Sequence, residues 1–351
     1  MSHPASAKLD RIAARYAAKS KVSAMSFAIE QPATGFTWGY GDIHQPFFIA
    51  SITKLYTVAM IMQLRDERAL TFDTRAAELL GEETMRGLNV HGGHDHGSAI
   101  TVRELLSHTS GLPDYFEQKH PDGTTVLSNM LRTDEGWAFE DLIERVRAMP
   151  SPFAPSTPGK ALYSDINYDL LGRIIEVATS SSYAHAIRKR VIEPLGLHDW
   201  LFAPGTLDRY EEVASVLHGR TPLHIPKTIA CSFPASGAVV STPADQVRFL
   251  RAFITGELFS VHYLTEMTAH WNSVFSRLEP LDYGIGIMRF TIPRWLSPFA
   301  QIPEMIGHSG SFGTVLYHIP ERDLYISGTV NQMQPRSLPY PLLTRLVAQF
   351  R

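Results

Sequence analysis

Alternating hydrophobic and polar residues near the N-terminus predict two β-strands. Within residues 23–30 the apolar side chains of Met25, Phe27 and Ile29 recur at every second position, so they would share one face of a strand. A second segment of this kind, residues 35–41, follows across a turn that contains proline and glycine. The two segments are therefore expected to form a hairpin.

The region after this hairpin is predicted to be mainly helical. Residues 55–64 form a mainly apolar run without glycine or proline and lead into four charged residues, which predicts a mostly buried helix. Thr101 and Glu104 stand three positions apart as a capping box at the start of a short helix. Further helices are expected over residues 7–19, 137–149, 169–179, 184–193, 246–255 and 337–351.

Strand-like segments return towards the C-terminus, over residues 283–290, 305–311, 314–319 and 324–330. Short turns separate the last three, which predicts an antiparallel sheet. Placing the early hairpin beside these late strands makes the helical middle an insertion. We therefore predict an α+β fold with a discontinuous sheet domain, residues 1–48 and 221–351, and an inserted, mostly helical domain, residues 49–220, that carries the helix after residue 50.

Composition excludes several classes of protein. The chain has 351 residues, of which 44% are hydrophobic and 19% are charged, and a formal net charge of −3. These values are ordinary for a globular protein and give no sign of a nucleic-acid partner. The single cysteine, Cys231, allows neither an internal disulfide nor a cysteine-based metal cluster. No apolar run reaches the ~18 residues of a membrane span, and no secretory signal opens the chain, so we expect a cytoplasmic protein.

Histidines raise the question of a metal site. His91, His94 and His96 lie within a glycine-containing segment, which we interpret as a flexible surface loop because such a backbone does not hold ligands in fixed positions. A zinc enzyme built on this loop is the alternative. His108 lies next to the end of a predicted helix, where we expect it to satisfy nearby carbonyl groups; a catalytic role is the alternative.

Ser51 and Lys54 are the strongest candidates for chemistry. They lie three positions apart at the start of the buried helix, so their side chains would share one face with Cβ atoms roughly 5–6 Å apart. A serine hydroxyl needs a neighbour that takes its proton, and a lysine does this only if burial and the helix N-terminus lower its pKa. From these residues alone, an N-capping serine beside a solvated lysine remains the alternative.

Three motifs stand in a recognisable order: Ser51 to Lys54, Tyr163 to Asp165, and His308 to Gly310. With them, the sequence resembles the serine β-lactamase and penicillin-binding protein superfamily. The resemblance is to its class C-like branch of class C β-lactamases, DD-peptidases, D-aminopeptidases and family VIII carboxylesterases. Residues 105–112, 168–172, 241–245 and 283–286 also resemble that branch.

The resemblance implies a β-lactamase/transpeptidase-like fold and a mechanism through an acyl-enzyme. Ser51 would attack a carbonyl group, and Lys54 would accept or relay its proton. Tyr163 would act as general base and then protonate the leaving group, which requires nearby positive charge to stabilise its phenolate. Tyr168 is the alternative for this role, although the spacing to the following Leu-Leu-Gly favours Tyr163.

The third motif would form the opposite wall of the substrate cleft. By resemblance, His308 opens this strand motif opposite Ser51, and Gly310 and Ser311 follow as substrate-binding positions. The backbone N–H groups of Ser51 and Ser311 would form the oxyanion hole.

Two positions depart from the pattern of many β-lactamases. His308 stands where lysine is common, and a neutral imidazole anchors a substrate carboxylate less well than an ammonium group. Asp165 replaces the commoner asparagine and is expected at the substrate as well. It would either pair with Lys54 and raise the pKa of that lysine, or stay protonated and mimic the amide.

These observations predict a serine hydrolase that needs no metal or other cofactor and acts on a small ester or amide, as an esterase or a D-amino-acid peptidase. A true class C-type β-lactamase or DD-carboxypeptidase, with a β-lactam among its ligands, is the first alternative. A catalytically silent ligand-binding protein of the same fold is the second.

Overall fold

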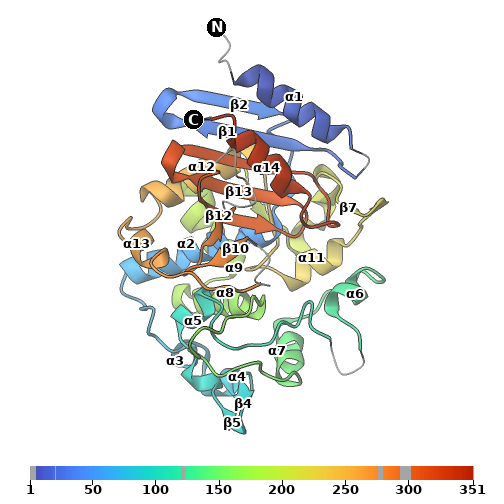
Figure 1. Cartoon of the computed structure of the whole chain (residues 1–351). Helices are drawn as coiled ribbons and strands as arrows, with labels where there is room; N and C mark the ends of the chain where they lie inside the picture. Colours follow the sequence, from blue (N-terminus) through green and yellow to red (C-terminus); the bar gives the residue numbers. More distant parts are fainter. Residues whose placement is uncertain (1–4, 20, 120–122, 276–279, 293–301, 351) are drawn as a thin grey trace.

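A seven-stranded antiparallel sheet lies at the centre of the computed structural model, which describes residues 5–19, 21–119, 123–275, 280–292 and 302–350 (Figure 1). The strand order is β10-β11-β12-β13-β14-β1-β2. The strands are β1 (Ser26–Gln31), β2 (Phe36–Tyr40), β10 (Leu281–Tyr283), β11 (Met288–Phe290), β12 (Met305–Gly310), β13 (Thr314–Ile319) and β14 (Leu324–Thr329). The N-terminal hairpin pairs with β14 and Phe27 lies opposite Gly328, so the predicted placement of early beside late strands is confirmed.

Helices from the two ends of the chain pack together over this sheet. Helix α1 (Ser6–Ala17) contacts α14 (Pro339–Val347), as Figure 1 shows, while α12 (Pro243–Thr255) contacts β1, β13 and β14. Every residue of β13 and β14 is buried. The sheet is therefore covered on both faces, which explains why its central strands are apolar along most of their length.

A buried helix connects the sheet with the helix-rich region. Helix α2 (Thr53–Asp66) follows a 3₁₀ turn (Ala50–Ile52) and packs against α8 (Ile166–Thr179). Just before the turn, β3 (Phe47–Phe48) pairs with β9 (Val239–Ser241), which also pairs with β6 (Trp200–Leu201). This small second sheet, which the sequence patterns did not predict, fixes the point at which the chain enters α2.

The remaining elements are short. The helices are α3 (Ala76–Leu80), α4 (Glu82–Met85), α5 (Val102–Leu106), α6 (Val126–Met130), α7 (Phe139–Arg147), α9 (Tyr183–Ile187), α10 (Glu193–Leu195), α11 (Pro226–Ser232) and α13 (Tyr263–Met267). The strands are β4 (Val90–His91), β5 (His94–Asp95), β7 (Leu217–His218) and β8 (Thr221–Pro222). At the start of α5 the predicted capping box is present, with the Thr101 N–H bonded to Glu104 Oε2 at 2.8 Å.

One predicted strand is wrong. Residues 283–290 do not form one strand but the inner ends of β10 and β11, joined by a turn. Gly286 in this turn has φ +75°, and a Cβ atom there would lie 2.6 Å from Val58 Cγ2. The backbone reverses here because glycine tolerates both the left-handed conformation and the close approach of α2.

The histidine-containing segment is a small exposed hairpin of β4 and β5 rather than an irregular loop. In the described part of the chain, no group of three His, Cys, Asp or Glu side chains is placed to hold a metal ion. The helices within the same ranges include none with the length and apolar character of a membrane span.

Candidate active site

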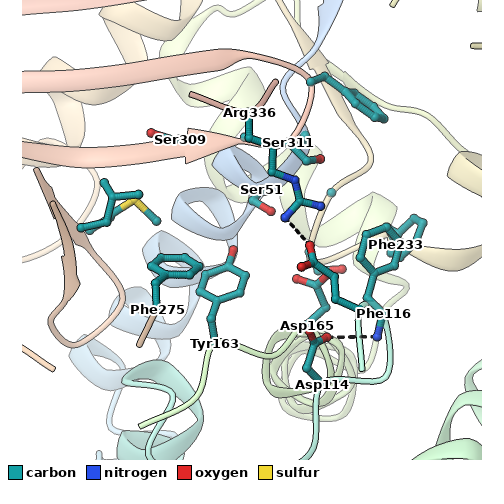
Figure 2. Close-up of a pocket in the computed structure, with 18 of the residues that line it drawn as sticks. Ser51, Asp114, Phe116, Tyr163, Asp165, Phe233, Phe275, Ser309, Ser311 and Arg336 are labelled. Atoms are coloured by element: carbon teal, nitrogen blue, oxygen red, sulfur yellow. Dashed lines mark hydrogen bonds and ion pairs between the residues drawn. The ribbon is translucent and has the colours of Figure 1, made fainter. Parts of the chain in front are cut away.

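A cleft of about 590 Å³ opens between strand β12 and the helix-rich region (Figure 2). This volume is in the range of small-molecule sites. Aromatic and aliphatic side chains form most of its wall, including Phe116, Phe233, Phe275 and Phe312, and Ser51 lies in its lining. Of the predicted site residues, Ser51, Tyr163, Asp165, Gly310 and Ser311 line this one cleft.

Ser51 is held by the 3₁₀ turn rather than by a helix cap. The preceding residue, Ala50, has φ +48°, a left-handed conformation that is uncommon for residues other than glycine. The N-cap of α2 is Ile52, and no side chain bonds to the first N–H groups of the helix. The alternative of an N-capping serine beside a solvated lysine is therefore wrong, and the Ser51 hydroxyl instead accepts a hydrogen bond from Lys54 Nζ at 3.2 Å.

Lys54 is completely buried and carries the positive charge of the site. Its Nζ lies 2.6 Å from Asp165 Oδ1 and donates to the backbone carbonyl of Ser236 at 2.9 Å. Burial acts to lower the pKa of Lys54, but the charges of Asp165 and Tyr163 outweigh it, so the pKa is raised above its ordinary value. The lowered pKa that a proton-accepting Lys54 would need is therefore not found, because the close approach of Asp165 outweighs burial. Of the two states predicted for Asp165, the structure contains the ion pair.

Tyr163 directs its phenol towards Ser51, as Figure 2 shows. Its ring lies between two others, with the centroid of His108 at 4.4 Å and that of Phe275 at 5.1 Å. Burial raises the pKa of Tyr163, the Lys54 ammonium opposes that shift, and Asp165 adds to it. The phenol is thus positioned to exchange a proton with Ser51, although it ionises only above the usual pH range of tyrosine.

Tyr168, the alternative for the same role, lies elsewhere. It is fully buried, and its hydroxyl bonds to Tyr283 at 2.9 Å and to the carbonyl of Leu106 at 3.3 Å. Tyr168 is not among the residues that line the cleft. The arrangement therefore favours Tyr163 as the tyrosine that faces Ser51.

His108 supports the site in a way that the sequence did not indicate. Its Nδ1 lies 3.2 Å from the backbone N–H of Ser164, which donates to it, and 3.0 Å from Asn167 Nδ2. Burial and then the charge of Lys54 lower its pKa well below the ordinary value. His108 is thus a neutral acceptor of N–H groups, and the expectation that it satisfies carbonyl groups is wrong.

Strand β12 forms the wall opposite the helices, but His308 does not line it. The imidazole is fully buried, with Nε2 3.0 Å from the Tyr283 hydroxyl and Nδ1 2.7 Å from the carbonyl oxygen of Ser309. Burial, followed by the charge of Lys54, lowers the pKa of His308 to about 3. His308 is therefore a neutral, buried side chain next to Tyr163, with the two ring centroids 6.4 Å apart, and its contact with substrate stays a prediction.

The cleft wall of β12 begins with Ser309 and continues through Gly310 and Ser311. A Cβ atom at Gly310 would lie 2.2 Å from Thr314 Oγ1 and 2.5 Å from the carbonyl oxygen of Ile49. Glycine therefore allows the strand to approach the turn that carries Ser51, as the predicted oxyanion hole would require.

Three charged residues in the cleft were not predicted from the sequence. Glu117 and Arg336 form an ion pair there, and both side chains are nearly half exposed. Asp114 also lines the cleft, and burial, with the nearby charge of Asp165, raises its pKa to about 7. None of the three lies in a motif, so only the fold brings them to the cleft.

Known proteins resemble this chain in sequence. Residues 15–349 match the family model described as Beta-lactamase. Penicillin-binding protein 4 of Amycolatopsis lactamdurans is 31% identical over 210 residues, which are 58% of this chain and 50% of that protein. The D-alanyl-D-alanine-carboxypeptidase/endopeptidase AmpH of Escherichia coli K12 is 26% identical over 287 residues, 79% of this chain and 68% of that protein. The chain thus spans about half to two thirds of the length of these relatives.

Solved structures share the fold. The D-amino acid amidase of Ochrobactrum anthropi SV3, complexed with L-phenylalanine amide, superposes with a TM-score of 0.76 at 21% identity, covering 98% of this chain and 97% of that one. EstCE1, described as a hydrolase with promiscuous acyltransferase activity, gives a TM-score of 0.76 at 18% identity, with 98% of both chains covered.

Proposed function

This chain belongs to the Beta-lactamase family, and we propose that it is a serine hydrolase that cleaves uncharged, largely apolar esters or amides through an acyl-enzyme on Ser51. The observation that carries the proposal is the meeting of a serine hydroxyl, a buried lysine and a phenol at one cleft with an aromatic wall. A hydroxyl in such a setting can be activated without a metal or other cofactor.

The first half of the reaction follows from the charges of the site. Lys54 stays an ammonium group, because Asp165 and Tyr163 raise its pKa, and it stabilises the minor fraction of Tyr163 that is a phenolate. This phenolate takes the proton of Ser51 as Oγ forms a bond to the carbonyl carbon. The oxyanion lies at the backbone N–H groups of Ser51 and Ser311, a type of contact that typically contributes ~3–4 kcal/mol.

The second half returns the site to its starting state. Tyr163, now protonated, donates its proton to the leaving oxygen or nitrogen as the bond to the carbonyl carbon breaks. A water molecule then attacks the acyl-enzyme, Tyr163 accepts a proton from it, and the proton passes to Ser51 Oγ as the acid leaves. Lys54 keeps its charge throughout.

The charges of the cleft support an uncharged substrate. The buried, neutral His308 provides no cation on the strand side, and Arg336 is paired with Glu117. A β-lactam or a peptide ending in D-alanine carries a carboxylate that needs a cation. We therefore rank esters and amides above β-lactams and D-alanyl peptides. The names of EstCE1 and of the Ochrobactrum amidase are consistent with this order.

Covalent labelling combined with a substrate panel tests the proposal. We expect a fluorophosphonate probe to modify Ser51, as identified by peptide mass spectrometry, and Ser51→Ala to abolish the adduct. Among p-nitrophenyl esters, D-amino-acid amides and nitrocefin, we expect an ester or amide to have the highest kcat/KM. An unlabelled protein that binds these compounds without turnover would instead be a silent receptor, and a preference for nitrocefin would favour the β-lactamase alternative.

A further inference from the structure

An ion pair reaches across the cleft beside the nucleophile. Glu117 lies in the segment between α5 and α6, in the helix-rich part of the chain, whereas Arg336 precedes α14, in the part that packs on the sheet. Both residues line the cleft together with Ser51. Figure 2 shows the Arg336 side chain extending from the side of Ser311 towards the acidic residues on the opposite wall.

Arg336 is the one lysine or arginine among the described residues that line this cleft. Lys54 is completely buried and already in contact with Asp165, and His308 is fully buried and does not line the cleft. A negatively charged group on a substrate would therefore find its cation at Arg336, whose guanidinium suits a carboxylate through paired hydrogen bonds.

Glu117 already supplies such a carboxylate. The Glu117 and Arg336 side chains are 45% and 44% exposed, and ion pairs at this exposure are weak and exchange easily with other partners. Asp114 and Asp165 line the same wall as further acidic groups. A substrate carboxylate must therefore displace an internal competitor and approach two other acidic side chains.

We propose that the Glu117–Arg336 ion pair determines the charge selectivity of this enzyme: Arg336 is a latent carboxylate-binding site, and Glu117 occupies it so that neutral substrates are preferred. The inference rests on the proposed hydrolase function and adds to it a specificity-determining pair. A neutral ester can enter beside the intact pair, whereas an anionic ester competes with Glu117. Removing the Glu117 charge should therefore shift the preference of the enzyme from neutral towards anionic esters.

The test compares matched neutral and anionic esters. The first probe pair is mono-p-nitrophenyl adipate and p-nitrophenyl heptanoate, which differ in charge on the acyl group. The second is 4-butyryloxybenzoate and its methyl ester, which differ in charge on the leaving group. In Glu117→Gln we expect the anionic-to-neutral ratio of kcat/KM to rise about tenfold for at least one pair, the size of effect that one charge-assisted contact can give. Added salt should reduce this gain, because the site is partly exposed.

Two further variants make the result specific. Glu117→Gln combined with Arg336→Gln should lose the gain, since the latent site is then absent. Glu212→Gln breaks another half-exposed pair, with Arg209, outside the cleft lining, and should leave the ratio as in the parent enzyme. An unchanged ratio in Glu117→Gln, or a gain that persists without Arg336, would overturn the inference while ester turnover still supports the hydrolase. Absence of both turnover and a Ser51 adduct would overturn both proposals.

Discussion

At the scale of single residues, the charge of Asp165 controls the proton equilibrium of the site. It contacts Lys54 at 2.6 Å and acts to raise the pKa of both Lys54 and Tyr163. If the Tyr163 phenolate is the base, kcat/KM should rise with pH into the alkaline range, because a raised pKa leaves little phenolate at neutral pH. Burial, with the added charge of the Asp165 carboxylate, thus favours the protonated, inactive form of the base.

Asp165→Asn tests this assignment. Removing the negative charge should lower the pKa of Tyr163, so the rising limb of kcat/KM against pH should move to lower pH. The asparagine can still offer an oxygen to Lys54, which keeps the geometry similar. The measurement is the pH profile of ester hydrolysis for the parent and the variant. If the rising part of the pH profile stays at the same pH or moves to higher pH, the result would argue against Tyr163 as the base.

The second residue-scale prediction concerns His108 as a positioning residue for Tyr163. Its imidazole packs on the Tyr163 ring and accepts the N–H of Ser164, so His108→Ala should leave the phenol poorly oriented. We expect kcat to fall about 10- to 100-fold with little change in KM. His108→Phe, which keeps a ring against Tyr163, should recover part of the loss. Equal losses in both variants would point to a purely structural role of the hydrogen bonds.

At the scale of elements, the contact between β12 and the 3₁₀ turn sets the width of the site. Gly310 lies against Ile49 and Thr314, and Thr314 Oγ1 donates to the carbonyl of Ile49 at 3.0 Å. A methyl group at Gly310 must push the strand away from the turn, which would separate the two N–H groups proposed for the oxyanion hole.

Gly310→Ala should therefore lower both stability and turnover. Overpacking of this kind typically costs about 1–3 kcal/mol in the free energy of unfolding, which urea titration measures. We expect kcat to fall more than 100-fold, as for the loss of an oxyanion contact. Gly205→Ala is the matched control, because a Cβ atom there meets nothing within 4 Å. Normal turnover in Gly310→Ala would show that the strand does not need this approach.

At the scale of the whole molecule, the two ends of the chain complete one structure. Strand β1 lies between β14 and β2 in the sheet, and α1 contacts α14. The Thr314 hydroxyl joins the same sheet to the turn that holds Ser51. A substitution that destabilises α1 should therefore also destabilise the active site, because the sheet connects the two.

Leu9→Ala tests this coupling. Leu9 is fully buried in α1, and a leucine-to-alanine change in a core typically costs about 2–5 kcal/mol. We expect the melting temperature measured by circular dichroism to fall, and the temperature of activity loss to fall with it. Activity that survives beyond the loss of sheet signal would instead show that the site region unfolds independently.

The longer helices and the main strands could largely be predicted from the amino-acid sequence. The apolar run of α2, the Thr101–Glu104 capping box and strands β12, β13 and β14 were predictable, because each depends on neighbours close in the chain. The ordered motifs that begin at Ser51 also indicated the family. The prediction of one strand over residues 283–290 was wrong, because the chain reverses direction at Gly286 and this reversal depends on the close approach of α2.

The electrostatics of the site, by contrast, depend on how the folded chain brings distant residues together. Whether Lys54 gains or loses proton affinity depends on the competition between burial and the distance to Asp165, which is more than a hundred positions away. The hydrogen bond between His308 and Tyr283 and the ion pair between Glu117 and Arg336 likewise join residues that are distant in sequence. The periodicity of apolar residues along the chain indicates which side chains will be buried. Charge interactions depend on distances and on solvent exposure, and these exist only once the chain has folded.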